Sequence, residues 1–360
     1  MKISKLLKSV RLYGAARWGA DRFLSAGEFL KRWVYRSVCR RELREREVLE
    51  ERPAVLVVMC AGGIGNVIEA TPLVQALRIR WPKCRLTILT PYEDMFGEWC
   101  IVDEVCSDRA ELAGRRFDYT FVPFWGWHGF PENEVGDGFE RGEVFVSRPA
   151  LGKWFLRNER DYNVDLARRL GYRGPAPWSY VNVRKPAVAD ELAEPWLCVL
   201  PGGKTDDRWR WKRWPNYAEL IGVVRKEWQG CRVCVVGTED DEVDERVFED
   251  EMVVDLRGKL SLAESAWVLK HSAGVVGNDC GPMHMADAVG ARAVAIFGPT
   301  CVVKNGGRGK NVVITAGEGC QPCQYGEELT ECEAGECMRE LGAERVFAMV
   351  RDVLGRYLQG

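Results

Sequence analysis

From residue 53 onward, short apolar runs rich in β-branched residues alternate with segments of helical periodicity. This alternation is typical of an α/β fold with parallel sheets. The runs form two series, and each series opens with an apolar strand followed by glycines. The first series predicts strands at 54–59, 86–89, 102–105 and 119–122, and the second predicts strands at 196–200, 233–236, 253–256, 274–276 and 292–297.

Prolines punctuate the stretch between the two series, which places a hinge near residues 174–194. We therefore expect two α/β domains, over 51–185 and 186–345, followed by a C-terminal helix over 346–360. Residues 1–50 precede the first strand and form an extension of different character.

The extension is strongly basic. Its first 40 residues carry ten Lys or Arg and two Asp or Glu, and apolar residues at 3, 6, 7 and 10 follow helical spacing with lysines between them. This pattern predicts a basic amphipathic helix, which suits peripheral contact with the anionic inner face of a membrane. A solvated helix, or one that contacts another copy of the chain, explains the same pattern equally well.

The whole chain of 360 residues is 46% hydrophobic and 29% charged, with a formal net charge of −2. This composition excludes disordered, collagen-like and small disulfide-stapled proteins. No apolar run reaches membrane-spanning length, and the charged N-terminus lacks the apolar core of a signal peptide, so we expect a cytoplasmic protein. The nearly balanced charge and the lack of a recognised binding module argue against a nucleic-acid partner.

A polar loop over residues 277–284 lies between an apolar strand and a helix in the second series. Proline suits the first turn of a helix, and the N–H groups of a helix start bind phosphate. We expect the aspartate of this loop to cap or orient the helix start and the histidine to donate to a diphosphate, although an ordinary capped helix with a packed histidine explains the same residues. The candidate donor-binding residues are Asp279, Cys280, Gly281, Pro282, Met283 and His284.

Basic residues follow the first strand of the same series, at Lys204, Lys212 and Arg213, with Thr205 beside the first of them. Ligands of doubly wound sheets bind outside the carboxyl ends of the strands, so this segment and the 277–284 loop should converge on one crevice. The cations there would neutralise a leaving diphosphate, whereas a solvated basic loop is the simpler alternative. Glu239, after the next strand, would accept from ribose hydroxyls or cap a helix.

A glycine-rich loop containing Gly62, Gly63 and Gly65 enters a helix directly after the first strand. It matches neither the GxGxxG dinucleotide fingerprint nor the lysine-bearing P-loop, so it supports neither NAD binding nor ATP hydrolysis. We expect this loop to lie near the acceptor or the donor phosphates.

Taken together, these segments resemble glycosyltransferase family 9, the ADP-heptose:lipopolysaccharide heptosyltransferases. The resemblance covers roughly residues 53–345. It implies two facing Rossmann-like domains of the GT-B type, with the acceptor mainly on the N-terminal domain and the nucleotide-sugar on the C-terminal one, and inversion at the sugar carbon without a catalytic metal. The matching stretches are Gly65-Asn66 with Ala70-Thr71-Pro72, Lys212-Arg213-Trp214-Pro215, and Asp279 to His284 continuing to Phe297-Gly298-Pro299-Thr300.

The catalytic base is the difficulty, because the family places an Asp where this chain has Asn66. An amide cannot accept the proton of an acceptor hydroxyl. Glu69 stands three positions later on the same helix face and would replace that Asp. The same spacing is close to a capping box in which Asn66 caps the helix and Glu69 reaches back to it. Another carboxylate, or impaired catalysis, is the remaining alternative.

Four cysteines gather within eighteen residues late in the chain, at Cys320, Cys323, Cys332 and Cys337. Their spacing suits a tetrahedral thiolate site for zinc or iron, and free thiols explain it as well. A metal held by four thiolates would be structural, because no coordination position stays open for catalysis.

These residues and the resemblance lead to one expected function. It is inverting, metal-independent transfer of heptose or a related sugar from a nucleotide-sugar, expected to be ADP-heptose, to lipopolysaccharide core or to another glycan or lipid-linked acceptor. Transfer to a protein side chain is the alternative among enzymes. A nucleotide-sugar-binding protein that has lost catalysis is the alternative that Asn66 motivates.

Overall fold

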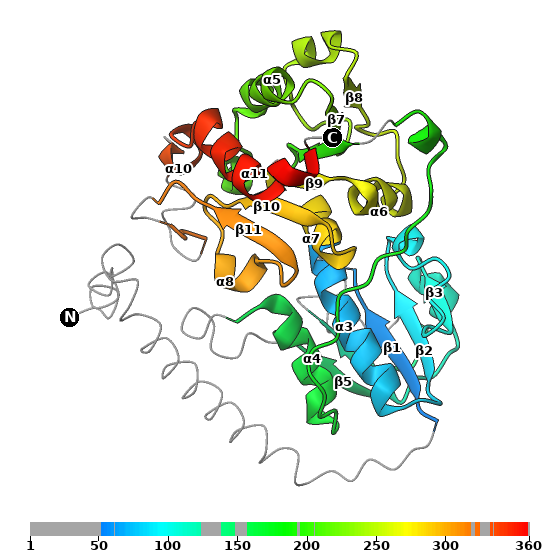
Figure 1. Cartoon of the computed structure of the whole chain (residues 1–360). Coiled ribbons are helices and arrows are strands. Elements are labelled where there is room, and N and C mark those ends of the chain that lie inside the picture. Colours follow the sequence, from blue (N-terminus) through cyan, green and yellow to red (C-terminus); the bar gives the residue numbers. More distant parts are fainter. Residues whose placement is uncertain are drawn as a thin grey trace, which may run out of the picture. The chain divides into compact units, whose positions relative to one another are not determined.

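The computed structural model describes residues 52–60, 62–123, 138–147, 157–192, 195–204, 206–317, 321–324, 332–333 and 335–358. The helix predicted for the extension over 1–50 lies outside these residues. Within them, strands and helices alternate along the chain in two parallel sheets, so the predicted α/β class is confirmed (Figure 1).

The first sheet contains five parallel strands of the described residues, in the order β3-β2-β1-β4-β5. Its central strand reads as an unbroken apolar run, AVLVV, because a parallel strand at the centre of such a sheet is covered on both faces. The elements of this part are β1 (Ala54–Val58), α3 (Ile64–Arg80), β2 (Arg85–Leu89), η1 (Glu93–Met95), β3 (Glu104–Cys106), η2 (Arg109–Leu112), β4 (Tyr119–Val122), β5 (Glu143–Val146) and α4 (Glu159–Arg169).

The second sheet contains six parallel strands of the described residues, in the order β11-β10-β9-β6-β7-β8. Its elements are η4 (Ala187–Asp190), β6 (Trp196–Leu200), η5 (Asp207–Lys212), α5 (Tyr217–Glu227), β7 (Arg232–Val235), η6 (Glu245–Glu249), β8 (Val253–Asp255), α6 (Leu262–His271), β9 (Gly274–Asn278), α7 (Gly281–Ala288), β10 (Arg292–Ile296), α8 (Val302–Asn305), β11 (Lys310–Ile314), α10 (Glu336–Arg339) and α11 (Ala343–Leu358).

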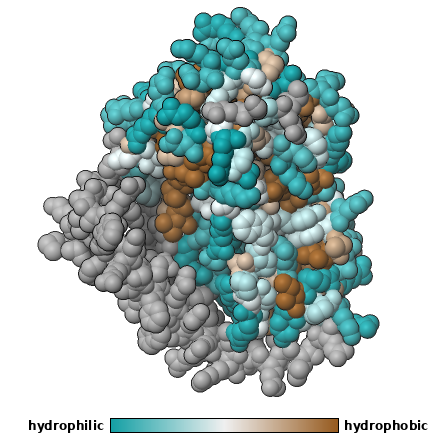
Figure 2. All heavy atoms as spheres, viewed as in Figure 1, coloured by the Kyte–Doolittle hydropathy of each residue, from teal (hydrophilic) through white to brown (hydrophobic). Residues whose placement is uncertain are grey.

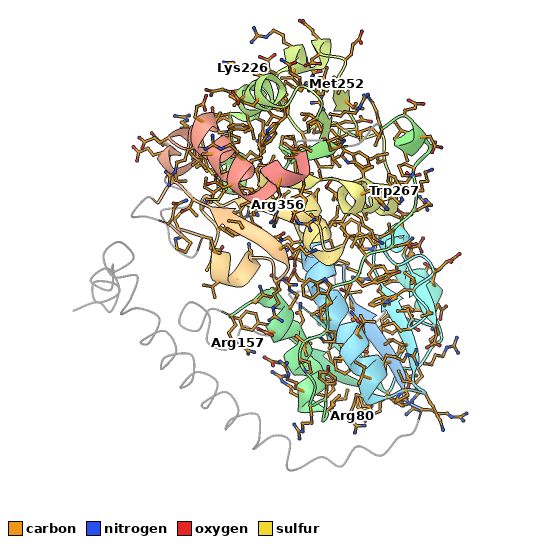
Figure 3. The ribbon with its side chains drawn as sticks, viewed as in Figure 1. Arg80, Arg157, Lys226, Met252, Trp267 and Arg356 are labelled. Carbon is orange, nitrogen blue, oxygen red and sulfur yellow. The ribbon has the colours of Figure 1, made fainter. Side chains whose placement is uncertain are left out.

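Local sequence signals explain where several helices begin and what they pack against. Ser261 starts α6 with a capping box, in which its side chain accepts from the Glu264 N–H and the Glu264 carboxylate accepts from the Ser261 N–H at 2.9 Å. Trp267 of this helix (Figure 3) stacks against Trp196 of β6. The C-terminal helix begins at Ala343, three residues before the predicted start, and contacts α5, β9, β10 and β11.

The structure adds two strands that the sequence did not predict, β5 and β11. Both lie at an edge of their sheet, where only one neighbour pairs with the strand. Each contains only three consecutive apolar residues, a shorter run than in the central strands, and each has one buried residue beside half-buried and exposed ones.

Helices α3 and α7 contact each other near their starts and bring the two sheets' polar loops together (Figure 1). Glycines make this close approach possible. A Cβ atom on Gly65 of α3 would lie 2.7 Å from Cδ2 of His284 in α7. A Cβ atom on Gly281 of α7 would lie 3.1 Å from Cβ of Ile64. The two helix starts therefore face the same space with little between them.

The surface in Figure 2 is mostly hydrophilic, with apolar residues scattered in small groups. Among the described residues, the exposed large apolar side chains are few: Ile79, Val144, Trp178, Val302 and Val303. No described helix has the length and apolar content needed to cross a bilayer.

Two glycine-to-alanine variants test the packing of the second sheet. A Cβ atom on Gly277 in β9 would lie 2.4 Å from Cβ of Leu200 in β6, so Gly277→Ala should lower the free energy of unfolding by about 1–3 kcal/mol. Gly222 in α5 has open space around it, and Gly222→Ala should raise the free energy of unfolding by about 0.5–1 kcal/mol. Urea denaturation of both variants measures these changes in the free energy of unfolding. Equal effects of the two substitutions would contradict the close contact between β9 and β6 at Gly277.

Candidate active site

A cavity of about 580 Å³ collects the polar ends of both halves of the fold. Its walls come from the starts of α3, α4 and α7, from α8, and from the loops after β6 and β7. The loops after β6, β7 and β9 lie at the carboxyl ends of parallel strands, where ligands of doubly wound sheets bind. The predicted convergence of the 202–204 segment with the 279–284 loop is therefore present in the structure.

The start of α7 forms one wall of this cavity. Cys280 precedes the helix in an extended conformation, and Pro282 occupies the first turn, as predicted. Cys280, Gly281 and Pro282 line the cavity. The first N–H groups of a helix lack partners within it, and they carry the positive end of the helix dipole, so this wall suits an anion.

Asn278, the last residue of β9, fixes the loops beneath the cavity. Its side-chain NH₂ donates to the carbonyls of Pro201 at 2.7 Å and Gly202 at 3.0 Å. Its Oδ1 accepts from the Trp214 N–H at 3.1 Å and the Tyr217 hydroxyl at 2.8 Å. Because every polar atom of this buried amide has a partner, the loop after β6 and the segment before α5 are held together.

Lys212, Asp279 and His284 form a charged row along the cavity. Lys212 Nζ lies 3.2 Å from Asp279 Oδ2, and His284 Nε2 lies 3.5 Å from Asp279 Oδ1. Burial by itself would raise the pKa of Asp279, but Lys212, His284 and a hydrogen bond from Asn305 outweigh it and hold that pKa well below its usual range. Burial would lower the pKa of His284, but Asp279 and Glu69 raise it to about 10.

The row continues into the interior through Glu69. Glu69 Oε1 lies 3.1 Å from His284 Nδ1, and Glu69 Oε2 lies 2.9 Å from Nε of the fully buried Arg160. That Nε donates its hydrogen bond to Asn158 Oδ1, so the contact with Glu69 is one of charge. Arg160 Nη1 also pairs with Asp287 of α7 at 2.9 Å. Carboxylates and cations thus alternate without interruption from Lys212 to Asp287.

The structure overturns the capping box proposed for Asn66 and Glu69. The helix starts at Ile64, so Asn66 occupies its third position and accepts from the Gly63 N–H at 3.1 Å. Glu69 lies one turn further on and faces His284 instead of the helix start. The amide NH₂ of Asn66 donates to Glu159 Oε1 at 2.8 Å.

Glu159, the first residue of α4, is a cavity residue that the sequence did not single out. Its side chain is 4% exposed, and Oε2 lies 3.2 Å from Lys304 Nζ of α8. Burial raises the pKa of Glu159, while Lys304 and the hydrogen bond from Asn66 oppose that rise. Nothing in the local sequence marks this residue, because its partners lie 93 residues before it on α3 and far after it on α8.

Comparison with known proteins gives three sequence matches of interest. The model of glycosyltransferase family 9 (heptosyltransferase) matches residues 159–333. Lipopolysaccharide heptosyltransferase 1 of Salmonella typhimurium is 29% identical, over 41% of this chain and 46% of that protein. Lipooligosaccharide heptosyltransferase 2 of Haemophilus influenzae is 37% identical, and the match covers 68% of this chain and 83% of that protein.

The chain belongs to glycosyltransferase family 9.

Solved structures agree in fold with this family 9 glycosyltransferase. The ADP-heptose lipopolysaccharide heptosyltransferase II of Escherichia coli superimposes with a TM-score of 0.59 at 18% identity, covering 84% of this chain and 99% of that one. The iron-containing dodecameric glycosyltransferase TibC of enterotoxigenic E. coli gives a TM-score of 0.55 at 15% identity, covering 85% of this chain and 80% of that one. These likenesses show the GT-B fold predicted from the sequence.

The cavity brings together many of the predicted site residues of this glycosyltransferase. Lys204 is exposed at its rim and lies over the Trp209 ring with its ammonium 6.0 Å from the ring centroid. Thr205 lies outside the described residues. The predicted residues that line the cavity are Gly63, Gly65, Asn66, Glu69, Lys204, Lys212, Glu239, Asp279, Cys280, Gly281, Pro282 and His284.

Three predicted residues lie elsewhere. Gly62 precedes the cavity and adopts φ of +76°, a conformation that favours glycine, with the Asn66 side chain against it. Met283 is buried behind the start of α7. Arg213 lies along Gly203 and lines a neighbouring hollow. We therefore expect these three to support the site without touching a ligand in this cavity.

The wall predicted to hold the ribose contains a further carboxylate. Glu239 is exposed on the loop after β7. Asp241, two residues later, is buried and accepts from the Thr238 N–H at 2.7 Å. A Cβ atom on Gly202 would lie 2.5 Å from its Oδ2. Asp241 thus shapes this wall, and its place after a strand is the signal that could have pointed to it.

The cysteine site stays a prediction, because Cys320 lies outside the described residues. Cys337 is buried, and Cys323 and Cys332 are half-buried. Among the residues that the structure describes, no three or more His, Cys, Asp or Glu side chains are placed so that together they could hold a metal ion.

Removing Arg160 should destabilise the protein strongly. Arg160→Met would leave Glu69 and Asp287 as buried carboxylates without this cation, so we expect a loss of about 3–5 kcal/mol in the free energy of unfolding. Arg116→Met removes a mostly exposed pair with Glu140 and should have far less effect. Urea denaturation compares them, and similar losses in the two variants would contradict this role of Arg160.

The charged row also predicts how stability depends on pH. Folding raises the pKa of His284 from 6.5 to about 10, so its stabilising effect is complete below pH 6.5 and disappears as pH rises through 10. The difference in the free energy of unfolding between wild type and His284→Gln should therefore shrink over that interval. Denaturation at several pH values measures it, and a difference that grows with pH would refute the assignment.

Proposed function

We propose that this glycosyltransferase moves heptose from ADP-heptose to a lipopolysaccharide-core acceptor, with inversion at the sugar carbon and without a catalytic metal. The observation that carries the proposal is the cavity in which the start of α7 and Lys212 face the start of α3. The names of the relatives, which are lipooligosaccharide and lipopolysaccharide heptosyltransferases, support the sugar and the acceptor class.

The departing diphosphate would be stabilised by charge already present in the protein. Lys212, the rim residue Lys204 and the N–H groups at the start of α7 would surround it. Asp279 would hold Lys212 and the protonated His284 in place, so that little reorganisation accompanies the departure of the nucleotide. Glu239 would accept from the ribose hydroxyls at the opposite wall.

The acceptor would enter along the start of α3, where Gly63, Gly65 and Asn66 line the cavity. Its hydroxyl must lose a proton to a base as the new glycosidic bond forms. Asn66 cannot take that proton, and this specific observation favours a second candidate, a protein that binds ADP-heptose without turning it over.

One experiment separates the two candidates. Purified chain is incubated with ADP-heptose and lipopolysaccharide that lacks heptose, and the release of ADP and the anomeric configuration of the product are followed. Inverted product supports the proposal. Binding of ADP-heptose without turnover, whether the acceptor is this lipopolysaccharide, another glycan or a protein, supports the binding protein and overturns the transferase.

Lys212 should contribute directly to donor binding. Lys212→Ala removes a charged partner of the diphosphate and should weaken ADP binding by about 10-fold or more, measured by titration calorimetry. Lys226→Ala is the matched control, because Lys226 is exposed on α5 (Figure 3) and is not part of the cavity wall. Equal affinity in the two variants would remove Lys212 from the donor site.

A further inference from the structure

Among the described residues, six carboxylates line the cavity, and they differ in the groups that they contact. Asp279 is held by two cations and an amide, and its pKa lies well below the usual range. Glu69 turns both oxygens toward cations, His284 and Arg160. Each of these two carboxylates therefore already faces two cations. Glu239, Asp240 and Asp241 belong to the loop after β7, on the proposed ribose side.

The sixth carboxylate is Glu159. Its Oε1 lies 2.8 Å from the amide nitrogen of Asn66, at the helix position where the family resemblance places an Asp. A different element, α4, therefore delivers a carboxylate to the place where α3 lacks one. We infer that Glu159 is the general base of this enzyme and that Asn66 orients it. This inference rests on the proposed function and adds the residue that accepts the proton.

In the proposed transfer step, each bond that forms is matched by one that breaks. The acceptor O–H bond breaks and its proton moves to the Glu159 carboxylate, while the acceptor oxygen forms a bond to the anomeric carbon. The bond from that carbon to the diphosphate oxygen breaks, and the nucleoside diphosphate leaves with the electron pair beside Lys212. Glu159 then returns the proton to solvent through the open cavity.

The surroundings of Glu159 make its carboxylate more basic than that of an ordinary glutamate. Burial and the nearby Glu69 raise its pKa above the ordinary value of a glutamate, although Lys304 of α8 and the Asn66 amide of α3 counteract part of that rise. Arg160, the next residue on α4, turns toward Glu69 and Asp287 and does not occupy the Glu159 oxygens. Oε1 of Glu159 accepts from the Asn66 amide and Oε2 pairs with Lys304, and a carboxylate oxygen that accepts one hydrogen bond keeps a lone pair for an acceptor hydroxyl.

A carboxylate exchange between the two positions tests the inference, with ADP-heptose and heptose-free lipopolysaccharide as probes. Glu159→Gln should lower kcat roughly 100-fold or more while ADP affinity stays close to wild type. The double variant Asn66→Asp, Glu159→Gln should regain at least about tenfold of that loss, because it returns a carboxylate to the same place. Asp161→Asn is the control, since Asp161 lies on the same turn of α4 and pairs with Arg308 outside the cavity wall.

The pH profile supplies a readout that a purely structural role would not change. Lys304→Met removes the cation that opposes the effect of burial, so the acidic limb of kcat/KM should move to higher pH. Three results would overturn Glu159 as the base while transfer by wild type still stands. They are an acidic limb that Lys304→Met does not move, a wild-type kcat in Glu159→Gln, and a loss of kcat that adding Asn66→Asp does not relieve. Wild type that binds ADP-heptose without turnover overturns the proposed function itself.

Discussion

The arrangement of this site depends on one constraint: each buried charge needs a neighbouring group of opposite charge. Arg160 is fully buried, and removing a cation of this kind from water costs several kcal/mol unless carboxylates surround it. Glu69 from α3 and Asp287 from α7 provide that compensation. Because these partners come from helices of different sheets, neutralising Arg160 also sets how α3, α4 and α7 approach one another.

The same constraint gives each ionisable group of the cavity a distinct state. Asp279 remains an anion, since its cationic partners outweigh its burial, and His284 remains a cation between two carboxylates. Glu159 pairs with one cation among the described residues, Lys304, and is equally buried. Groups of similar chemistry thus differ in basicity through their neighbours, which is how proteins assign separate tasks to carboxylates.

Sequence patterns predicted those parts of the fold and site whose signals are local. The central strands, such as β1 and β6, read as unbroken apolar runs because both faces are covered, whereas the edge strands β5 and β11 contain only three consecutive apolar residues each and were missed. The helix start at Cys280 and Gly281 was found because strand, loop and proline are adjacent in sequence. Glu159 was missed because its importance comes from Asn66 and Lys304, which only the folded chain brings near.

The charged row from Lys212 to Asp287 contains three cations and three carboxylates when His284 is protonated, so it is electrically neutral as a whole. A neutral array exerts little field beyond its immediate neighbourhood, and it does not draw anions in from a distance. The row by itself therefore contributes little to the long-range attraction of an anion. Close to the cavity wall, the row acts through the fixed positions of the Lys212 ammonium group and the α7 helix start, which favour an anion whose oxygens fit both.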